Sequence, residues 1–134
     1  MRKRDIDVFV DVSRVLSNRE IWKTCEEQLD DISKVIGVYI DNAIEATSVA
    51  DLKSILIEVD YEDKKIKFMF SNTYKGILDI SKMDNEGYTT KGKGKGYGLS
   101  LVKDILYHNK FLHQARELNG RYYVQKLYIN TGEA

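Results

Sequence analysis

The sequence contains a single cysteine, Cys25, so an intramolecular disulfide and a paired-cysteine metal cluster are both excluded. It also has no surplus of charge, because 21 basic residues balance 21 acidic ones. Nucleic-acid-binding domains usually carry a basic excess, so the composition does not favour that class. No stretch approaches the roughly 18 consecutive apolar residues of a membrane-spanning helix. We therefore expect a soluble, cytoplasmic piece, which can equally be the soluble part of a larger membrane protein.

What is present is typical of a folded domain. Apolar residues make up 43% of the chain and charged residues 31%, which argues against disorder. A chain of 134 residues is enough for one hydrophobic core. We expect residues 1–134 to form a single domain.

Hydrophobic periodicity predicts the order of the elements. Ile6, Val8, Val10 and Val12 alternate and predict a strand, whereas residues 13–24 are ambiguous. Apolar residues at helical spacing predict an amphipathic helix over about residues 26–47. Two alternating runs, at residues 54–61 and 64–71, predict a hairpin, and a second helix is expected over residues 99–109. Residues 110–130 predict a last pair of strands, joined by a turn at Asn119-Gly120.

This order implies an α/β (α+β) sandwich, with helices on one face of a mixed or antiparallel sheet. Between the hairpin and the second helix, about residues 73–98 have only weak periodicity and are rich in glycine. A loop of that length inside a compact domain is usually a lid or a binding loop.

The end of this loop reads GYTTKGKGKGYG and precedes the second helix. Glycine-rich backbone and the free N–H groups of a helix N-terminus bind anions, and lysines add positive charge. A Walker A motif fails at Gly94, where a hydroxyl residue is required, and the Rossmann spacing fails in every register. From the loop alone, a phosphate site, a solvated linker and an RNA-binding segment all remain open.

The first helix carries the polar run DNAIEAT within an apolar pattern. Asn42 and Glu45 share a face at i, i+3, and Asp41 is adjacent. Asparagine is mildly unfavourable inside a helix, and its amide oxygen is a possible Mg²⁺ ligand beside phosphates and water. A solvated helix flank is the alternative for such a triplet taken alone.

Together, DNAIEAT and GYTTKGKGKGYGLSLV resemble the N box and the G2 box of the GHKL ATPase superfamily. The resemblance is to sensor histidine kinases, and most closely to the Agr-type quorum-sensing receptor kinases. It implies a Bergerat fold over nearly the whole chain, with a mixed, mainly antiparallel sheet and a long ATP lid. It also implies that ATP and Mg²⁺ are the cofactors.

The resemblance assigns roles to individual residues. Asn42 would ligate the Mg²⁺ that bridges the ATP phosphates, and Asp41 and Glu45 would shape that site. Lys91 would contact phosphate. Glu45, at the Mg²⁺ site, and Lys91, at the phosphates, are the candidates for a catalytic role. The remaining matched positions are the lid residues Thr89 and Thr90, the hinge glycines Gly94, Gly96 and Gly98, and Leu99, which would begin the helix that caps the phosphates.

Two departures from the family pattern bear on activity. Where many members carry D-x-G-x-G, with an aspartate that accepts from the adenine amino group, this chain has FSNTYKG. Asn72 is the matching position, and Gly76 is the nearby glycine, so we expect weaker adenine recognition. Val38 stands one turn before Asn42, where other members place a second ligand or a hydrolytic glutamate. We therefore expect little intrinsic ATP hydrolysis.

The chain contains two histidines, His108 and His113, both after the G2 box, and we expect surface or structural roles for them. The resemblance implies that the phosphorylated histidine lies on an upstream dimerisation domain, after membrane helices, with a response regulator as the next partner. The isolated domain is expected to be a monomer that binds no nucleic acid. The alternatives are an anti-sigma-type serine kinase, a non-catalytic GHKL nucleotide-binding regulator and an RNA-binding module.

Overall fold

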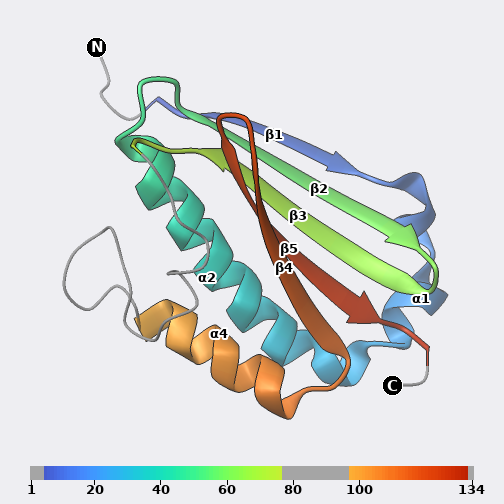
Figure 1. The fold of residues 1–134 in the computed structure, drawn as a ribbon. Coiled ribbons are helices and arrows are strands. Elements are labelled where there is room, and N and C mark those ends of the chain that lie inside the picture. The colour runs from blue at the N-terminus through green and yellow to red at the C-terminus, as the bar shows by residue number, and fades with distance from the viewer. Residues whose placement is uncertain (1–4, 77–96, 133–134) are drawn as a thin grey trace.

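The computed structural model describes residues 5–76 and 97–132. Within them, five strands form one sheet in the order β1-β2-β3-β5-β4 (Figure 1). Strand β1 (Asp7–Val12) is parallel to β2 (Ser54–Glu62), and every other neighbouring pair is antiparallel. The other strands are β3 (Lys65–Thr73), β4 (Leu112–Asn119) and β5 (Tyr122–Asn130). The predicted mixed, mainly antiparallel sheet is confirmed.

Two long helices, α2 (Leu29–Ser48) and α4 (Tyr97–His108), cover one face of this sheet (Figure 1). The segment that was ambiguous in the sequence folds as a 3-10 turn, η1 (Arg14–Ser17), and a short helix, α1 (Arg19–Lys23). Another turn, η2 (Glu26–Gln28), then leads into α2. Asn18 begins α1 because its side chain accepts a hydrogen bond from the Glu20 N–H.

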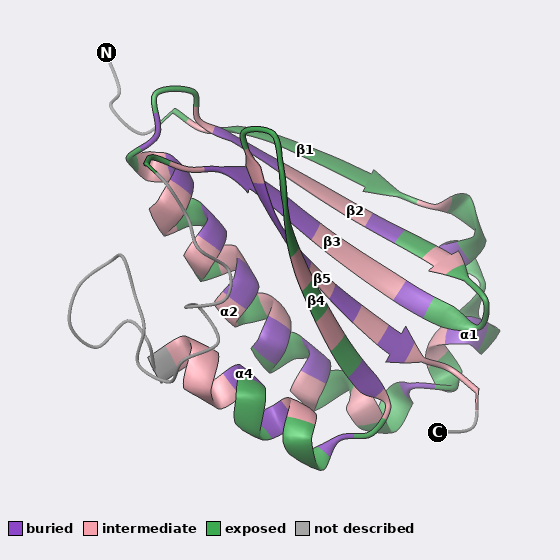
Figure 2. Ribbon diagram, viewed as in Figure 1, coloured by how far each residue is buried: buried purple, intermediate pink, exposed green. Residues whose placement is uncertain are grey.

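The core lies between α2 and the middle of the sheet (Figure 2). Ile32, Val35 and Tyr39 are buried on the sheet-facing side of α2. The Tyr39 ring meets Phe70 of β3 edge-on, with ring centroids 5.8 Å apart. Not all of the apolar residues at helical spacing are buried, since Leu29 and Ile44 are 41% and 44% exposed on the flank of the helix.

Both predicted hairpins form with two-residue turns. Asp63 and Lys64 have φ of 53° and 61°, the left-handed values that a type I′ turn requires at both central residues. In the second hairpin Gly120 has φ of 61°, which glycine adopts without steric cost.

The predicted loop boundaries were wrong at both ends. Thr73 is the last residue of β3, and α4 begins at Tyr97, so Leu99 does not begin the helix and Gly98 lies inside it. A glycine fits there because a Cβ at position 98 would lie 3.1 Å from Cγ1 of Val38 on α2. The rest of the expected lid, residues 77–96, lies outside the described residues.

Among the residues that the structure describes, no helix is both long enough and apolar enough to cross a membrane.

Candidate nucleotide-binding site

The polar triplet lies in the C-terminal half of α2. Asp41 is exposed, whereas Asn42 and Glu45 are half-buried. Val38, one turn before Asn42, faces α4, because its side chain holds the atoms nearest to a Cβ placed at Gly98. The flank of α2 that carries Asn42 and Glu45 is therefore the flank on which the N-terminus of α4 packs.

Asn72 is a fully buried polar residue near the end of β3, with an exposed fraction of 0%. Its Nδ2 donates to the Thr73 carbonyl at 2.9 Å. Its Oδ1 is buried and receives no hydrogen bond from any part of the chain that the structure describes. A buried acceptor without a donor costs about 1–3 kcal/mol, so such an atom points to a ligand that supplies the donor. An exocyclic amino group of a nucleobase is a donor of this kind.

Two contacts between α2 and β3 bracket these residues. At one end the Tyr39 ring packs on Phe70, and at the other the Thr47 hydroxyl bonds to the Thr73 hydroxyl. The turn of α2 that carries Asn42 and the β3 position of Asn72 both lie between these contacts. The structure thus brings the two predicted motifs to the same end of the helix–sheet interface.

Three buried hydroxyl residues at this end were missed in the sequence. Thr47 is 0% exposed, and its Oγ1 accepts a hydrogen bond from the Ser54 N–H at 3.0 Å. The Thr73 Oγ1 also approaches that N–H, at 3.2 Å. The cluster ties the end of α2 to the start of β2 and the end of β3. Helical spacing from Tyr39 through Ala43 to Thr47 was the signal that could have revealed it.

Tyr123 of β5 is the cross-strand neighbour of Asn72 and was not predicted to matter. Burial raises the pKa of its phenol, and the Arg116 guanidinium partly offsets that rise. Burial also holds the pKa of Tyr39 far above its ordinary value. Both phenols therefore stay neutral at physiological pH. The Tyr39 hydroxyl donates to Gln114 Oε1 at 2.9 Å.

Five predicted site residues lie outside the described residues: Thr89, Thr90, Lys91, Gly94 and Gly96. Gly98 and Leu99 are half-buried in the first turn of α4. The free N–H groups of that turn are suited to phosphate oxygens. No group of three or more His, Cys, Asp or Glu side chains suited to a metal occurs in the described part of the chain.

A comparison with protein families matches residues 28–130 to the GHKL domain. This match includes α2, the sheet from β2 onward and α4. The chain belongs to the GHKL domain family.

This GHKL domain is similar to part of a bacterial sensor protein. It is 35% identical over 78 residues to the sensor protein CitS of Bacillus subtilis (strain 168), an alignment that covers 57% of this chain and 14% of CitS. The chain therefore spans only a small part of that relative.

Solved structures share the fold of the GHKL domain. The catalytic domain of the histidine kinase ThkA matches with a TM-score of 0.70 and 23% identity, over 97% of this chain and 82% of that one. The Acinetobacter baumannii histidine kinase AdeS matches with a TM-score of 0.66 and 14% identity, over 98% of this chain and 57% of that one. The chain thus has the fold of histidine kinase catalytic domains.

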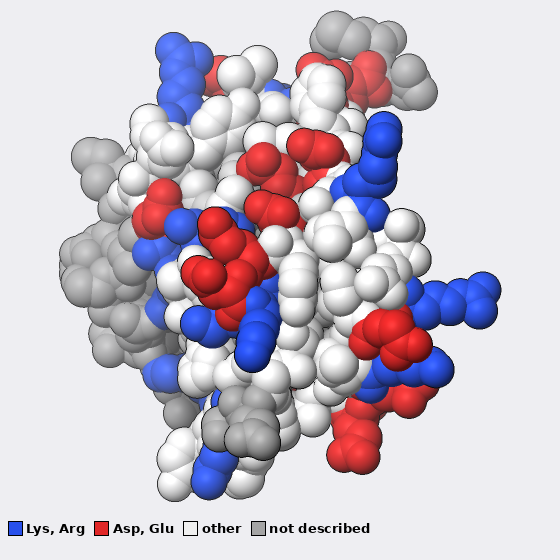
Figure 3. Space-filling view, turned by 90° about the vertical axis from the view of Figure 1, so that its right-hand side faces the viewer, with Lys and Arg blue, Asp and Glu red and all other residues white. Residues whose placement is uncertain are grey.

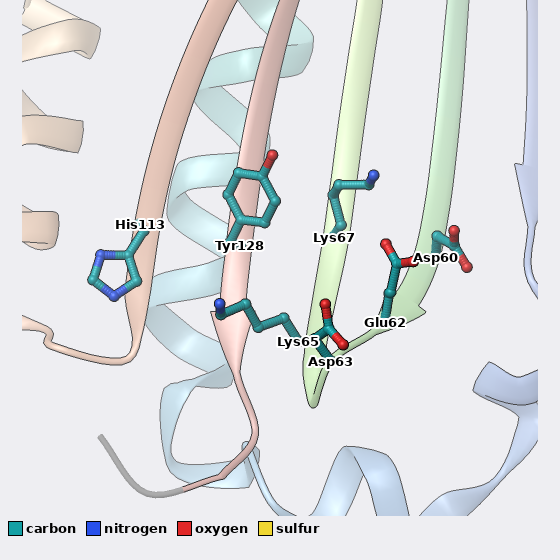
Figure 4. A pocket seen from close by; sticks show the side chains of 7 residues that line it. All are labelled: Asp60, Glu62, Asp63, Lys65, Lys67, His113 and Tyr128. Atoms are coloured by element: carbon teal, nitrogen blue, oxygen red, sulfur yellow. The ribbon is translucent and has the colours of Figure 1, made fainter.

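The two histidines of the GHKL domain are exposed, as expected. His108 ends α4, and its Nδ1 lies 2.9 Å from the Asp104 carbonyl oxygen. His113 is in β4 and lines a cavity of about 280 Å³ on the face of the sheet opposite the helices. Figure 4 shows the side chains around this cavity, which come from four strands and the Asp63 turn. None of the predicted site residues lines it.

A second cavity, of about 350 Å³, adjoins the end of β3. Thr73, Tyr74 and Gly76 contribute to its wall, together with Ala50 and Arg121. It begins one residue beyond Asn72 and so lies at the same end of the sheet as the candidate site.

Proposed function

We propose that this GHKL domain is the ATP-binding catalytic domain of a sensor histidine kinase. It transfers the γ-phosphoryl group of Mg-ATP to a histidine on a separate dimerisation domain in a two-component system. The observation that carries the proposal is the buried Asn72 Oδ1, which has no donor among the described residues and lies at the same end of the α2–β3 interface as Asn42. Family membership and the fold of histidine kinase catalytic domains support it.

The residues fit ATP in chemical type. Asn72 would accept from the adenine amino group, and Asn42 would supply the amide oxygen for Mg²⁺. Asp41 and Glu45 would hold water molecules and shape that site, with Glu45 the candidate for a catalytic role. The first turn of α4, at Gly98 and Leu99, would offer N–H groups to the phosphates.

The lid would complete the site through Lys91, with Thr89, Thr90, Gly94 and Gly96 providing its phosphate-facing backbone and hinges. Bound Mg-ATP supplies the phosphoryl group and part of the charge neutralisation. The chain's own residues position it, and positioning and charge neutralisation account for most of the catalysis of phosphoryl transfer.

We place the acceptor histidine outside this chain. His108 and His113 are exposed, one at the end of α4 and the other on β4, away from the Asn42 flank of α2. In the full protein, an upstream helical domain would supply the histidine and the dimer contact, and a response regulator would take the phosphoryl group. The domain would then work in the cytoplasm, beneath a membrane receptor. An Agr-type quorum-sensing receptor is the finer assignment that the DNAIEA motif favours.

A non-catalytic nucleotide-binding regulator is the second candidate. Val38 favours it, because this side chain, which lies next to Gly98, stands at the position where other members of the family place a second ligand. The two candidates differ in what happens after nucleotide binds.

Phosphoryl transfer separates them. The domain is incubated with Mg²⁺, ATP labelled at the γ position and the dimerisation domain of the same full-length protein. The measured quantity is protein-bound label that is acid-labile and base-stable, as expected of phosphohistidine. Transfer to the acceptor histidine is the expected result. Nucleotide binding without transfer would contradict the kinase proposal and support the regulator. Absence of nucleotide binding would overturn both proposals.

A further inference from the structure

Strand β1 is an edge strand whose six residues are all exposed. Three of them are valines on the helix side of the sheet: Val8, Val10 and Val12, which are 53%, 63% and 52% exposed. Phe9, on the opposite face, is 59% exposed. The valines are uncovered because α2 packs over β3 and β2, away from the β1 edge (Figure 2).

The backbone of β1 offers an unpaired hydrogen-bonding edge. The Asp7 N–H donates to the Lys53 carbonyl at 3.1 Å, and the Ser13 N–H donates to the Val59 carbonyl at 2.8 Å. Backbone groups alternate in direction along a strand, so the odd-numbered residues bond to β2. The N–H and C=O groups of Val8, Val10 and Val12 therefore point to the open edge, where the described residues place no strand.

The outer face of this edge is acidic. Asp7 and Asp11 flank Phe9, and Glu58 of β2 is the register partner of Asp11. Figure 3 views the side of the molecule that lies on the right in Figure 1, where acidic side chains gather beside basic ones. β1 itself contains no basic residue.

This charge favours a basic partner strand over a second copy that pairs in the register with Phe9 opposite Phe9. If a second copy paired antiparallel with Phe9 opposite Phe9, Asp7 of one copy would face Asp11 of the other. Like charges directly opposite destabilise a strand pair, and no basic residue of β1 offsets them. A strand with Lys or Arg on that face would instead form cross-strand ion pairs.

We propose that β1 is a strand-addition site for an extended segment of a partner protein, apolar on one face and basic on the other. The segment's backbone bonds to Val8, Val10 and Val12, and its apolar residues cover the exposed valines. Its basic residues pair with Asp7 and Asp11. Such an edge is otherwise a liability for aggregation, which the aspartates limit. The site is independent of the nucleotide-binding proposal.

Binding of two labelled peptides to the full chain tests this proposal by fluorescence anisotropy at low ionic strength. One peptide alternates valine and lysine, and its control alternates valine and glutamate. The lysine peptide should bind at least about tenfold more tightly, a difference of about 1.4 kcal/mol. Hydrogen exchange should slow at the amides of Val8, Val10 and Val12.

Two variants separate backbone pairing from charge. Val10→Pro removes an outward-facing N–H without removing a hydrogen bond to β2, and should lower the affinity for the lysine peptide at least about tenfold. Asp7→Lys with Asp11→Lys should reverse the peptide preference, whereas Glu27→Lys, a charge reversal on η2, should leave it unchanged. Equal binding of both peptides, no binding, or protection at other amides would overturn the proposal. Concentration-dependent dimers that Val10→Pro abolishes would assign the edge to a second copy instead.

Discussion

At the scale of single residues, Asn72 has a side chain that lowers the stability of the fold and that a nucleotide-binding role would explain. Its Oδ1 is a buried acceptor without a donor among the described residues, while its Nδ2 bonds to the Thr73 carbonyl at 2.9 Å. A residue selected for stability alone would be apolar or fully hydrogen-bonded at this position. The sequence marked Asn72 as the counterpart of the family aspartate, but only the structure reveals its complete burial.

Replacing Asn72 by leucine should therefore lower the affinity for ADP with little change in the free energy of unfolding. Asn72→Leu keeps a similar volume and removes the unpaired acceptor, so the free energy of unfolding should change by less than about 1.5 kcal/mol. ADP affinity should fall at least about tenfold, because the adenine amino group loses its acceptor. Thermal unfolding with and without ADP measures both effects. An ADP-induced rise in Tm as large as that of the unchanged protein would contradict this role for Asn72.

At the scale of elements, the end of α2 is fixed by the buried hydroxyl groups of Thr47 and Thr73, which bond to each other and to the backbone of Ser54. Thr47→Val removes one hydroxyl without changing the shape of the side chain. It should lower the free energy of unfolding by about 1–3 kcal/mol, because the Ser54 N–H and the Thr73 hydroxyl lose a buried partner. Urea denaturation measures the loss. Thr24→Val is the matched control, since Thr24 is exposed; equal losses in both variants would contradict the role of the buried cluster.

The contact between α4 and α2 depends on the absence of a side chain at Gly98. A larger residue would collide with Val38, whose Cγ1 would lie 3.1 Å from a new Cβ. Gly98→Val should therefore cost about 1–3 kcal/mol of stability, as overpacking usually does. Combining it with Val38→Ala should recover part of that loss, which a double-mutant cycle measures. Strict additivity of the two changes would show that the two side chains do not meet.

The element scale also shows what periodicity can and cannot predict. The stripe from Ile32 to Ala43 predicted α2, and Asn119-Gly120 predicted the second hairpin. Alternation in β1 correctly placed its valines on one face, but periodicity does not say which faces another element covers, and these valines are exposed. The start of α4 at Tyr97 was missed because glycine is a weak helix former and Gly98 was therefore assigned to the loop. In the structure Gly98 lies inside the helix, next to Val38, where a side chain would be crowded.

At the scale of the whole molecule, the order of elements was enough to predict the sandwich and its one-sided helices. The candidate site was predicted only in part, because it joins residues distant in sequence. Asn42 and Asn72 were each predicted from their motifs, and their roles toward nucleotide stay predictions. Thr47 and Tyr123 acquire their positions from the register of helix and strands. The phosphate side of the site, with Lys91, stays a prediction.

Buried phenol and thiol groups couple the stability of the whole fold to pH. Burial raises the pKa values of Tyr39 and Cys25 above their ordinary values, so both groups are neutral in the folded chain. In the unfolded chain they ionise near their ordinary values, roughly pH 10 and pH 8.5. The stabilising contribution is therefore complete at neutral pH and decreases as the pH rises above those values.

Urea denaturation between pH 7 and pH 11 should accordingly show a falling free energy of unfolding above about pH 9. Tyr39→Phe should reduce the steepness of that fall, because it removes the more strongly shifted phenol. The same slope in both proteins would contradict the assignment to Tyr39.

The central claim is that this GHKL domain binds a magnesium–adenine nucleotide between α2, β3 and α4. Calorimetric titration with ADP, with and without Mg²⁺, on the unchanged protein and on Asn42→Ala tests it most directly. The account predicts binding that Mg²⁺ strengthens and that Asn42→Ala weakens at least about tenfold in the presence of Mg²⁺ only. No binding to the unchanged protein at millimolar ADP, or equal binding to both proteins with Mg²⁺, would contradict it.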